Sequence, residues 1–496
     1  MIEKTVAELM CFASSHWGLD PLDKIYLQNY VLRELKLVAP YEGEIDEAEI
    51  ASLEVPDRFV EAIIRHGVEA LGLDEGEAER KAEAIMGLLS PLPSVVTKTF
   101  DLAYENSPKE ATDYLYRLSI ASHYVQKTKD DRNEVYEATF PEGSKLEISI
   151  NLSKPEKNNK DIAKLVGAVS SSYPKCLLCL ENLGFEGNAK KAPRGNIRII
   201  PLTLNGERWY LQYSPYGYFD EHCILFHENH VPMEISKRIF ACLIDFVDLF
   251  PHYFIGSNSD LPIVGGSILD HEHFQGGLHL LPIFFAPTKE KIALKKHPGL
   301  ELEIVDFYDT VLKITGEDKE KILSLAEEIT LAWRGYGDPS LDIIASDEAG
   351  QHSTVTPLVR KTETGYEFFL ILRNNRCDET YPGGIFHAHP EYAHIKQEGI
   401  GLIEAAGRFI LPARLLRQSA LVEDIVKKGT KKEDYLQEHP DLAGFDLMVE
   451  TLKTRGISAR TYMGEICRNI LCNVAVFKDD AEGQAGLSRF LRGLDL

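Results

Sequence analysis

The first 140 residues carry apolar side chains at helical spacing and clear helix-start signals. Asp20-Pro21 and Ser107-Pro108 each place a capping side chain directly before a proline, an arrangement that opens helices. After the first of these signals, apolar residues recur at intervals typical of a helix, at Leu22, Ile25, Tyr26, Val31, Leu32 and Leu35. This stretch has no histidine pair, glycine-rich loop or carboxylate cluster. We therefore expect a helical region over residues 1–140 that serves as a scaffold or an interface.

From about residue 145 the pattern changes to strict alternation. "KLEISINLS" alternates apolar and polar positions, and Asn205-Gly206 separates two strand-like runs, which is the strongest short signal of a β-hairpin. A helical stretch follows, and "HYFIGSN" then leads into "GGSILDHEHFQGG" at residues 265–277. The apolar face of that helical stretch consists of Ile235, Ile239, Leu243 and Phe246. The order predicts an antiparallel sheet that ends in a His-x-His motif.

A similar order returns after a second helical stretch at residues 318–334. Pro357-Leu358, a turn at Gly365 and the strand-like run "YEFFLILRNNR" correspond to Pro201-Leu202, Asn205-Gly206 and "RWYLQY". "GGIFHAH" at residues 383–389 then corresponds to "GGSILDHEH". We interpret this recurrence as an internal duplication.

The length of 496 residues exceeds the roughly 250–300 residues over which a single hydrophobic core grows. With the duplication, this predicts an α+β protein in which residues 1–140 are helical and residues 141–300 and 301–496 form two sheet-containing units. The formal net charge of −23 argues against nucleic acid as a partner, because duplex binding relies on clustered Lys and Arg. A small phosphorylated ligand is still compatible with that charge.

Targeting signals and cysteine usage narrow the location. No stretch reaches roughly 18 uninterrupted apolar residues, and the first residues lack the pattern of a secretory signal peptide. Eight cysteines in so long a chain are too sparse for a disulfide scaffold. We expect a cytoplasmic protein with no membrane partner.

The motif at residues 271–275 concentrates reactive side chains. On an extended segment, alternation sends His271, His273 and Gln275 to one side and Glu272 to the other. A neutral imidazole is a good nucleophile toward phosphorus, and a neighbouring amide can donate to a phosphoryl oxygen as charge builds. These parts suit nucleotidyl transfer through a covalent histidine. A metal site and a purely structural role are equally compatible with the motif alone.

Two further clusters carry metal-ligand chemistry. Cys176-x-x-Cys179 has zinc-knuckle spacing but no second Cys-x-x-Cys, so a tetrahedral site would need two histidines from elsewhere, with His230 and His271 as candidates. His387 and His389 alternate in the second His-x-His, and His352 could supply a third nitrogen. Spacing alone does not separate a second metal site from histidines that are merely hydrogen-bonded.

Long segments resemble the longer bacterial form of the galactose-1-phosphate uridylyltransferase family. They include "SSYPKCLLC", "APRGNIRIIPLTLNGERWYLQYSPYGYFDEHCILF", "IGSNSDLPIVGGSILDHEHFQGG" and "GGIFHAHPEYAHIKQEGIGLIEAAGRFILPARL". The resemblance extends from "SPKEATDYLYRLS" to the C-terminus. It implies two half-barrel units of the histidine-triad type, a homodimer, and a ping-pong reaction that moves UMP from UDP-glucose to galactose 1-phosphate through a uridylyl-histidine.

The resemblance also implies residue roles. The nucleophile falls on His273 and the amide that donates to the uridylyl phosphate on Gln275, while Cys176, Cys179, His230 and His271 fall on the ligands of a structural zinc. A second divalent metal, present in some relatives, would use His352, His387 and His389, with no match for its carboxylate ligand. The His-x-His-x-Gln motif does not itself recognise the uracil base. A related nucleotide-sugar phosphorylase or adenylyltransferase, or a nucleotide-binding scaffold without turnover, are therefore alternatives.

Several residues are candidates for binding the substrate. Asn258 and Gly265-Gly266-Ser267 precede the nucleophile as the nucleotide-contacting stretch does in relatives, and Arg194 and Arg373 are candidate phosphate cations. We expect the aromatic residues of "WYLQYSPYGYF" to be sheet core.

Two residues beside the motif differ from relatives. Glu272 replaces a proline of shorter relatives and should point away from His273. Asp270 replaces a serine and, because an inward carboxylate would repel phosphate, should point outward.

Overall fold

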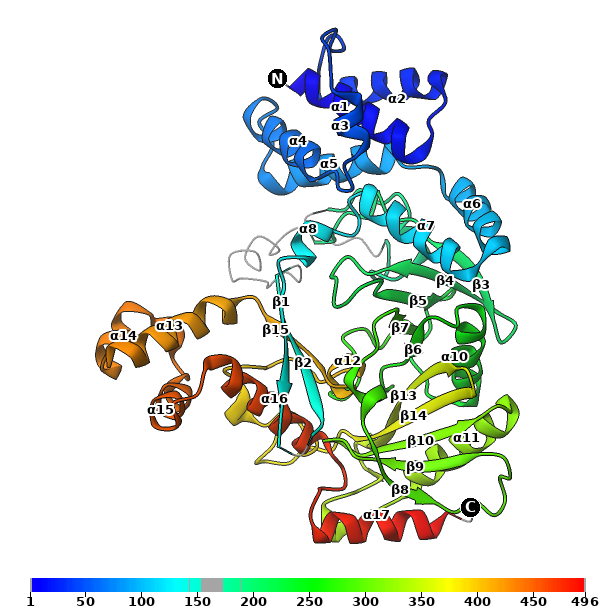
Figure 1. The fold of residues 1–496 in the computed structure, drawn as a ribbon, viewed down its shortest axis with the longest axis vertical. Coiled ribbons are helices and arrows are strands. Elements are labelled where there is room, and N and C mark those ends of the chain that lie inside the picture. Colours follow the sequence, from blue (N-terminus) through cyan, green and yellow to red (C-terminus); the bar gives the residue numbers. More distant parts are fainter. Residues whose placement is uncertain (1, 142, 153–172, 189, 495–496) are drawn as a thin grey trace.

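We describe the fold from a computed structural model of the chain, which covers residues 2–141, 143–152, 173–188 and 190–494. The N-terminal region is helical, as predicted. The helices of residues 2–89 cluster at one end of the molecule around a core of their own, whereas those of residues 93–121 share the core of the central sheet (Figure 1). The Asp20 side chain accepts a hydrogen bond from the amide of Leu22, and the Ser107 side chain accepts one from the amide of Glu110. The helices are α1 (Ile2–Trp17), α2 (Pro21–Glu34), α3 (Glu47–Ala51), α4 (Asp57–Glu69), α5 (Glu75–Leu89), α6 (Pro93–Asn106), α7 (Pro108–Ala121) and α8 (Lys127–Asp130).

Only the C-terminal half of α2 packs as its apolar pattern predicts. Val31, Leu32 and Leu35 are buried in a core shared with α1, α4 and α5. Leu22, Ile25 and Tyr26 are instead exposed. The periodicity therefore predicts the helix correctly but not the length of helix that reaches the core.

The central element is a ten-stranded sheet in which every neighbouring pair is antiparallel. Its strand order is β3-β4-β5-β7-β6-β13-β14-β10-β9-β8. The predicted hairpin joins β3 to β4, with Asn205 and Gly206 both at positive φ, as the tight turn requires. The strands are β3 (Ile200–Leu204), β4 (Glu207–Tyr213), β5 (Cys223–His227), β6 (Phe254–Gly256), β7 (His273–Gly277), β8 (Thr288–Ile292), β9 (Glu301–Val305), β10 (Val311–Gly316), β13 (Ser353–Thr362) and β14 (Gly365–Asn374).

The two predicted units share this one sheet. β6 pairs with β13, so that Ile255 lies opposite Val359 at the join. Helices α10 (Lys237–Leu249) and α11 (Lys319–Gly335) contact each other and both pack against β13. Both helices occupy the stretches where helical periodicity predicted them. The β13–β14 hairpin also matches the β3–β4 hairpin, because Pro357 faces Leu370 as Pro201 faces Tyr210.

The second His-x-His motif does not lie on a strand. Residues 383–389 form turns and irregular backbone, and the matching segment 265–272 is also irregular, but only the first motif runs into a strand, because His273 begins β7. The amide of Gly384 donates to the carbonyl of Tyr381, Gly384 has φ +113°, and the short 3-10 helix Pro390–Tyr392 begins directly afterwards. The glycine pair and flanking prolines of this segment favour turns over an extended strand.

The alternating segment at residue 145 also has an unexpected partner. It forms β2 (Lys145–Asn151), which pairs antiparallel with β1 (Glu134–Thr139) and parallel with β15 (Arg408–Pro412) in a separate three-stranded sheet. Alternation predicted a strand but could not reveal a parallel neighbour more than 250 residues away. This pairing links the predicted first unit to the second.

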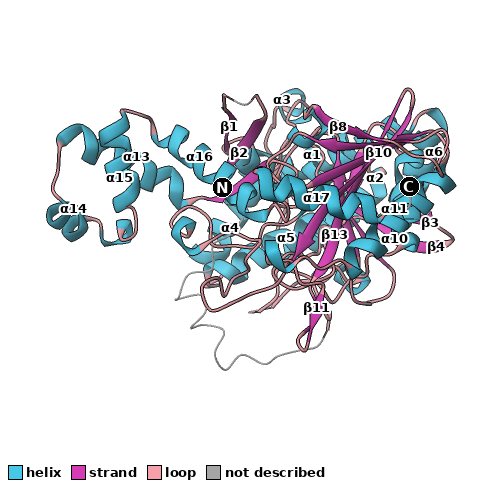
Figure 2. Ribbon diagram, turned by 90° about the horizontal axis from the view of Figure 1, so that it is seen from below, coloured by secondary structure: helices cyan, strands magenta, loops and turns pink. Residues whose placement is uncertain are grey.

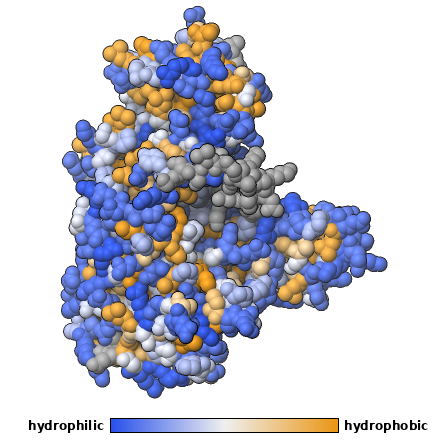
Figure 3. All heavy atoms as spheres, turned by 180° about the vertical axis from the view of Figure 1, so that it is seen from behind, coloured by the Kyte–Doolittle hydropathy of each residue, from blue (hydrophilic) through white to orange (hydrophobic). Residues whose placement is uncertain are grey.

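The C-terminal part is mainly helical, and part of it projects from the body of the molecule (Figures 1 and 2). Its helices are α12 (Leu402–Ala405), α13 (Arg414–Lys428), α14 (Lys432–Glu438), α15 (Asp446–Arg455), α16 (Ala459–Val474) and α17 (Ala481–Gly493). The face drawn in Figure 3 is largely hydrophilic, with hydrophobic groups scattered over it. Within the described ranges, every helix is too short or too polar to cross a membrane.

Candidate active site and metal centre

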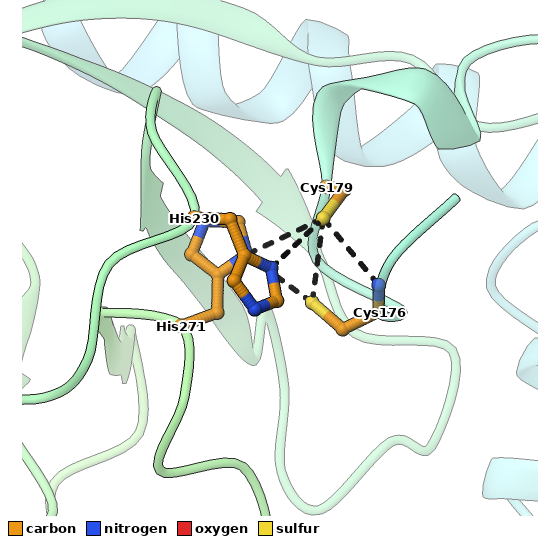
Figure 4. A group of neighbouring side chains, drawn as sticks. All are labelled: Cys176, Cys179, His230 and His271. Atoms are coloured by element: carbon orange, nitrogen blue, oxygen red, sulfur yellow. Dashed lines mark hydrogen bonds between the residues drawn. The ribbon is translucent and has the colours of Figure 1, made fainter. Parts of the chain in front are cut away.

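Two cysteines and two histidines from distant segments converge into one cluster (Figure 4). The Sγ atoms of Cys176 and Cys179 are 3.6 Å apart, and Cys176 Sγ lies 3.2 Å from Nδ1 of His271. Cys179 Sγ lies 3.2 Å from Nδ1 of His230 and 3.7 Å from Nδ1 of His271. A tetrahedral zinc with ordinary Zn–S and Zn–N bonds would space its ligand atoms about 3.4–3.8 Å apart. The four side chains therefore fit a zinc ion closely.

Each histidine of the cluster has a second partner on its other ring nitrogen. Nε2 of His271 lies 2.9 Å from the carbonyl oxygen of His227, and Nε2 of His230 lies 3.3 Å from a carboxylate oxygen of Asp270. These contacts direct both Nδ1 atoms toward the sulfurs, as outer partners do for metal-ligating histidines. Burial raises the pKa of the Cys176 thiol to about 12, so a cation is needed to hold it as a thiolate at neutral pH.

Asp270 points outward, as expected. Its side chain is 68% exposed and is directed at His230. Glu272 is also directed away from His273, because its carboxylate pairs with Arg238 at 2.5 Å in a buried position. Neither carboxylate lines the cavity described below.

His273 is the first residue of β7 and is almost fully buried. Its Nδ1 lies 2.8 Å from the carbonyl oxygen of His271, so the ring donates its Nδ1 proton there and keeps Nε2 as the unprotonated nitrogen. Burial lowers the pKa of His273, which favours the neutral and nucleophilic imidazole.

His273 and Gln275 both line a cavity of about 430 Å³ over one face of β4, β5 and β7, but His271 does not. Alternation predicted that all three would share one face. His271 lies outside the regular strand, where its ring turns into the cysteine cluster. The motif therefore divides between two adjacent places, with His273 and Gln275 at the cavity and His271 in the cluster with Cys176, Cys179 and His230.

Most of the predicted substrate-binding residues line the same cavity, namely Arg194, Asn258, Gly265, Gly266 and Ser267. The Arg194 guanidinium lies over the ring of Tyr124, with 5.5 Å between its central carbon and the ring centroid, and its Nε has no hydrogen-bond partner among the described residues. Asn258 accepts a hydrogen bond from the amide of Leu402 at 2.8 Å, which leaves its amide group toward Gly266. Arg194 is thus a buried cation with donor capacity to spare.

The glycines that close the motif serve the sheet and not the ligand. A Cβ atom on Gly276 would lie 2.2 Å from the carbonyl oxygen of Phe254, and one on Gly277 would lie 2.5 Å from that of Glu221. Neither residue lines the cavity. Their role is close strand packing.

Arg373 and the second histidine group do not take the positions expected of them. Arg373 is fully buried and donates to the carbonyl oxygen of Ile400 at 2.7 Å, away from the cavity lining, so we leave it out of the site. His352 contacts Asn375 and Asp347, His387 accepts from the amide of Ile400, and His389 contacts the carbonyl oxygen of Ile385. Among the described residues, these three histidines do not form a metal-ligand cluster.

Several cavity residues lie outside every motif that the sequence suggested. Lys396 is buried and donates to Glu398, Glu404 and the carbonyl oxygen of Ile410, each at 3.0 Å. His222 contacts Gln275. Tyr216 and Tyr218 also line the cavity, although Trp209 and Tyr213 of the same aromatic run are sheet core, as expected. Isolated side chains in loops carry no periodic or spacing signal that would reveal them.

Comparison with known proteins gives the family. Residues 45–232 match the N-terminal domain of galactose-1-phosphate uridyl transferase, and residues 246–434 match its C-terminal domain. Galactose-1-phosphate uridylyltransferase of Caldanaerobacter subterraneus is 41% identical, with 98% of this chain and 96% of that protein aligned. The enzymes of that name from Clostridium acetobutylicum and Lactococcus lactis strain IL1403 are each 39% identical, with 99% of both chains aligned. The search of solved structures gave no significant match. The chain belongs to the galactose-1-phosphate uridylyltransferase family.

Proposed function

We propose that this protein is a UDP-glucose–hexose-1-phosphate uridylyltransferase that acts through a uridylyl-histidine. The observation that carries the proposal is the cavity in which the unprotonated Nε2 of a neutral histidine, an amide and a buried arginine converge in a chain of this family. Such a set provides a nucleophile, a donor to a phosphoryl oxygen and a cation for a second phosphate.

The reaction proceeds in two displacements at one phosphorus. Nε2 of His273 attacks the α-phosphorus of UDP-glucose, the bond to the bridging oxygen breaks, and glucose 1-phosphate leaves with the electron pair. A phosphate oxygen of galactose 1-phosphate then attacks the uridylyl phosphorus, the P–N bond breaks, and His273 regains its lone pair. The Nδ1–H of His273 donates to the His271 carbonyl oxygen throughout, which stabilises the positive charge that the ring acquires in the adduct.

The other side chains bind and orient the substrate. Gln275 donates its amide hydrogens to the transferred phosphoryl group, and Arg194 holds the phosphates. Asn258 and the Gly265-Gly266-Ser267 turn contact the nucleotide. All of them border the cavity that contains His273.

The experiment that tests the function is exchange with purified protein. UDP-glucose and galactose 1-phosphate should yield UDP-galactose and glucose 1-phosphate, with parallel lines in double-reciprocal plots as a ping-pong scheme requires. UDP-glucose alone should release glucose 1-phosphate in an amount no greater than the enzyme. Reaction with ATP in place of UDP-glucose would favour a related adenylyltransferase or phosphorylase, and no reaction with any nucleotide would favour a binding scaffold.

We propose that Cys176, Cys179, His230 and His271 hold a structural zinc. The distances between their ligand atoms and the second partners of both histidines support this assignment. Zinc bound there would hold the segment before β7 in place beside the nucleophile. It would not activate water, because four protein ligands leave no open position.

Replacing Cys179 with serine should weaken zinc binding by more than about 100-fold, since a ligand contributes more than the outer partners that support it. Zinc content per chain and the midpoint of thermal unfolding should both fall. Cys377→Ser is the matched control, because Cys377 is exposed and lies outside the cluster. Equal zinc content in Cys179→Ser and Cys377→Ser would contradict the assignment.

The proposal extends to the assembly and its setting. The repetition of hairpin and helix across the shared sheet supports two half-barrel units of the histidine-triad type. We further propose that the protein is a homodimer in the cytoplasm. Sedimentation of the purified protein measures its oligomeric state directly.

A further inference from the structure

His222 is a buried cavity residue to which neither the motifs nor the proposed mechanism assigns a role. It directly precedes β5, and its neighbour Cys223 pairs with Gly276, the residue after Gln275 on β7. This register brings Nε2 of His222 to 3.1 Å from the side-chain oxygen of Gln275. The imidazole stacks on Tyr218 with ring centroids 4.9 Å apart and planes inclined by 17°, and Phe219 packs against it at 4.7 Å. The ring is therefore held in one orientation.

The protonation of His222 determines what it offers to Gln275. Burial lowers the pKa of His222 to about 4, so at neutral pH the ring is uncharged and carries a single N–H. Its Nδ1 is buried and has no hydrogen-bond partner in the part of the chain that the structure describes. A proton on Nδ1 would be an unpaired buried donor, which proteins tolerate less well than an unpaired acceptor. The favoured tautomer carries its proton on Nε2, where Gln275 accepts it.

That hydrogen bond determines which end of the Gln275 amide faces the cavity. The oxygen and the nitrogen of an amide have nearly the same shape, so packing alone does not distinguish the two orientations. With the oxygen engaged by His222, the NH₂ group is the end of the amide left to face the cavity that Gln275 lines. The opposite orientation would present a carbonyl oxygen to an anionic phosphate.

We propose that His222 is a positioning residue that holds the Gln275 amide with its N–H donors toward the transferred phosphoryl group. The inference rests on the proposed function, because it assigns the orientation of a side chain that acts in the uridylyl transfer. It predicts that His222 acts through Gln275 and not on the substrate directly.

Two variants with amide side chains of different length test the contact between His222 and Gln275. In His222→Gln the new amide nitrogen can occupy the position of imidazole Nε2, whereas in His222→Asn it reaches only the position of Nδ1. The rate of uridylylation by UDP-glucose in a single turnover should fall by about tenfold in His222→Asn, within the range of coupling between contacting side chains. His222→Gln should recover to within about threefold of the wild-type rate. Equal losses in the two variants would overturn the proposal.

A double-mutant cycle excludes a purely structural role. His222→Asn should slow uridylylation in the wild-type background but change the rate by less than about twofold in a Gln275→Met background, where no amide is left to orient. Losses that multiply in the double variant would show that His222 acts independently of Gln275. Thermal unfolding midpoints of all variants separate loss of folding from loss of rate. If the wild-type protein forms no adduct at all, the proposed function fails first, and that result is distinct from any pattern among the variants.

Discussion

His273→Asn is expected to lower kcat/KM for uridylyl exchange by at least about four orders of magnitude, comparable to loss of a nucleophile in other covalent enzymes. The substitution removes Nε2, the only atom of the motif that can attack phosphorus from within the cavity. It retains a donor near the position of Nδ1, so the hydrogen bond to the His271 carbonyl oxygen can persist. The loss should therefore fall on chemistry while the thermal unfolding midpoint changes little.

His297→Asn is the matched control for this substitution. His297 pairs with Glu328 and does not line the cavity, so the same chemical change there should leave exchange within about twofold of the wild-type rate, as is usual away from a site. Exchange by His273→Asn within tenfold of the wild-type rate would contradict the assignment of the nucleophile.

Gln275→Met should lower kcat/KM by about 100- to 1000-fold, the cost of removing one donor from a developing oxyanion. Methionine keeps the length of the side chain but loses the N–H groups that face the phosphoryl oxygens. The loss should appear in the single-turnover rates of both half-reactions, because each passes through the same phosphorus. The KM for UDP-glucose should change less than kcat, since the donor acts most strongly on charge that builds in the transition state.

Gln275→Glu separates the donor from the shape of the side chain. A carboxylate can still accept the hydrogen bond from His222, but it presents a negative charge to the phosphates. Its activity should therefore be lower than that of Gln275→Met. A glutamate variant as active as the wild type would show that Gln275 makes no contact with the phosphoryl group.

Local patterns predicted the parts of this fold that depend on neighbouring residues. The caps at Asp20 and Ser107, the Asn205-Gly206 hairpin and helix α10 all form as expected, because each depends on interactions within a few residues. The parallel pairing of β2 with β15 was not predictable in this way, since strand alternation does not name the partner strand. Likewise, apolar periodicity predicted helix α2 but could not show that, within the described part of the chain, Leu22, Ile25 and Tyr26 have no neighbouring element to bury them.

The sequence also predicted those parts of the candidate site that belong to a local motif. Cys176 and Cys179 suggested a metal by their spacing, and the need for two further ligands made His230 and His271 candidates. The structure brings all four together. Arg373 was chosen by residue type and His387 by its His-x-His spacing and by the second metal site of some relatives, but both are buried with backbone partners. His222 and Lys396 were not predicted, because what distinguishes them is a contact formed only in the folded chain. His222 contacts Gln275, and Lys396 donates to Glu404.

If uridylyl transfer passes through Nε2 of His273, that residue must carry the uridylyl group between the two half-reactions. To test this, the wild-type protein is incubated with UDP-glucose labelled in the α-phosphate, quenched without acid, and the label is mapped by peptide mass spectrometry. We expect one acid-labile uridylyl group per active site on the peptide that contains His273, released quantitatively as UDP-galactose when galactose 1-phosphate is added. Label on another residue, or exchange without any covalent label, would rule out His273 as the carrier.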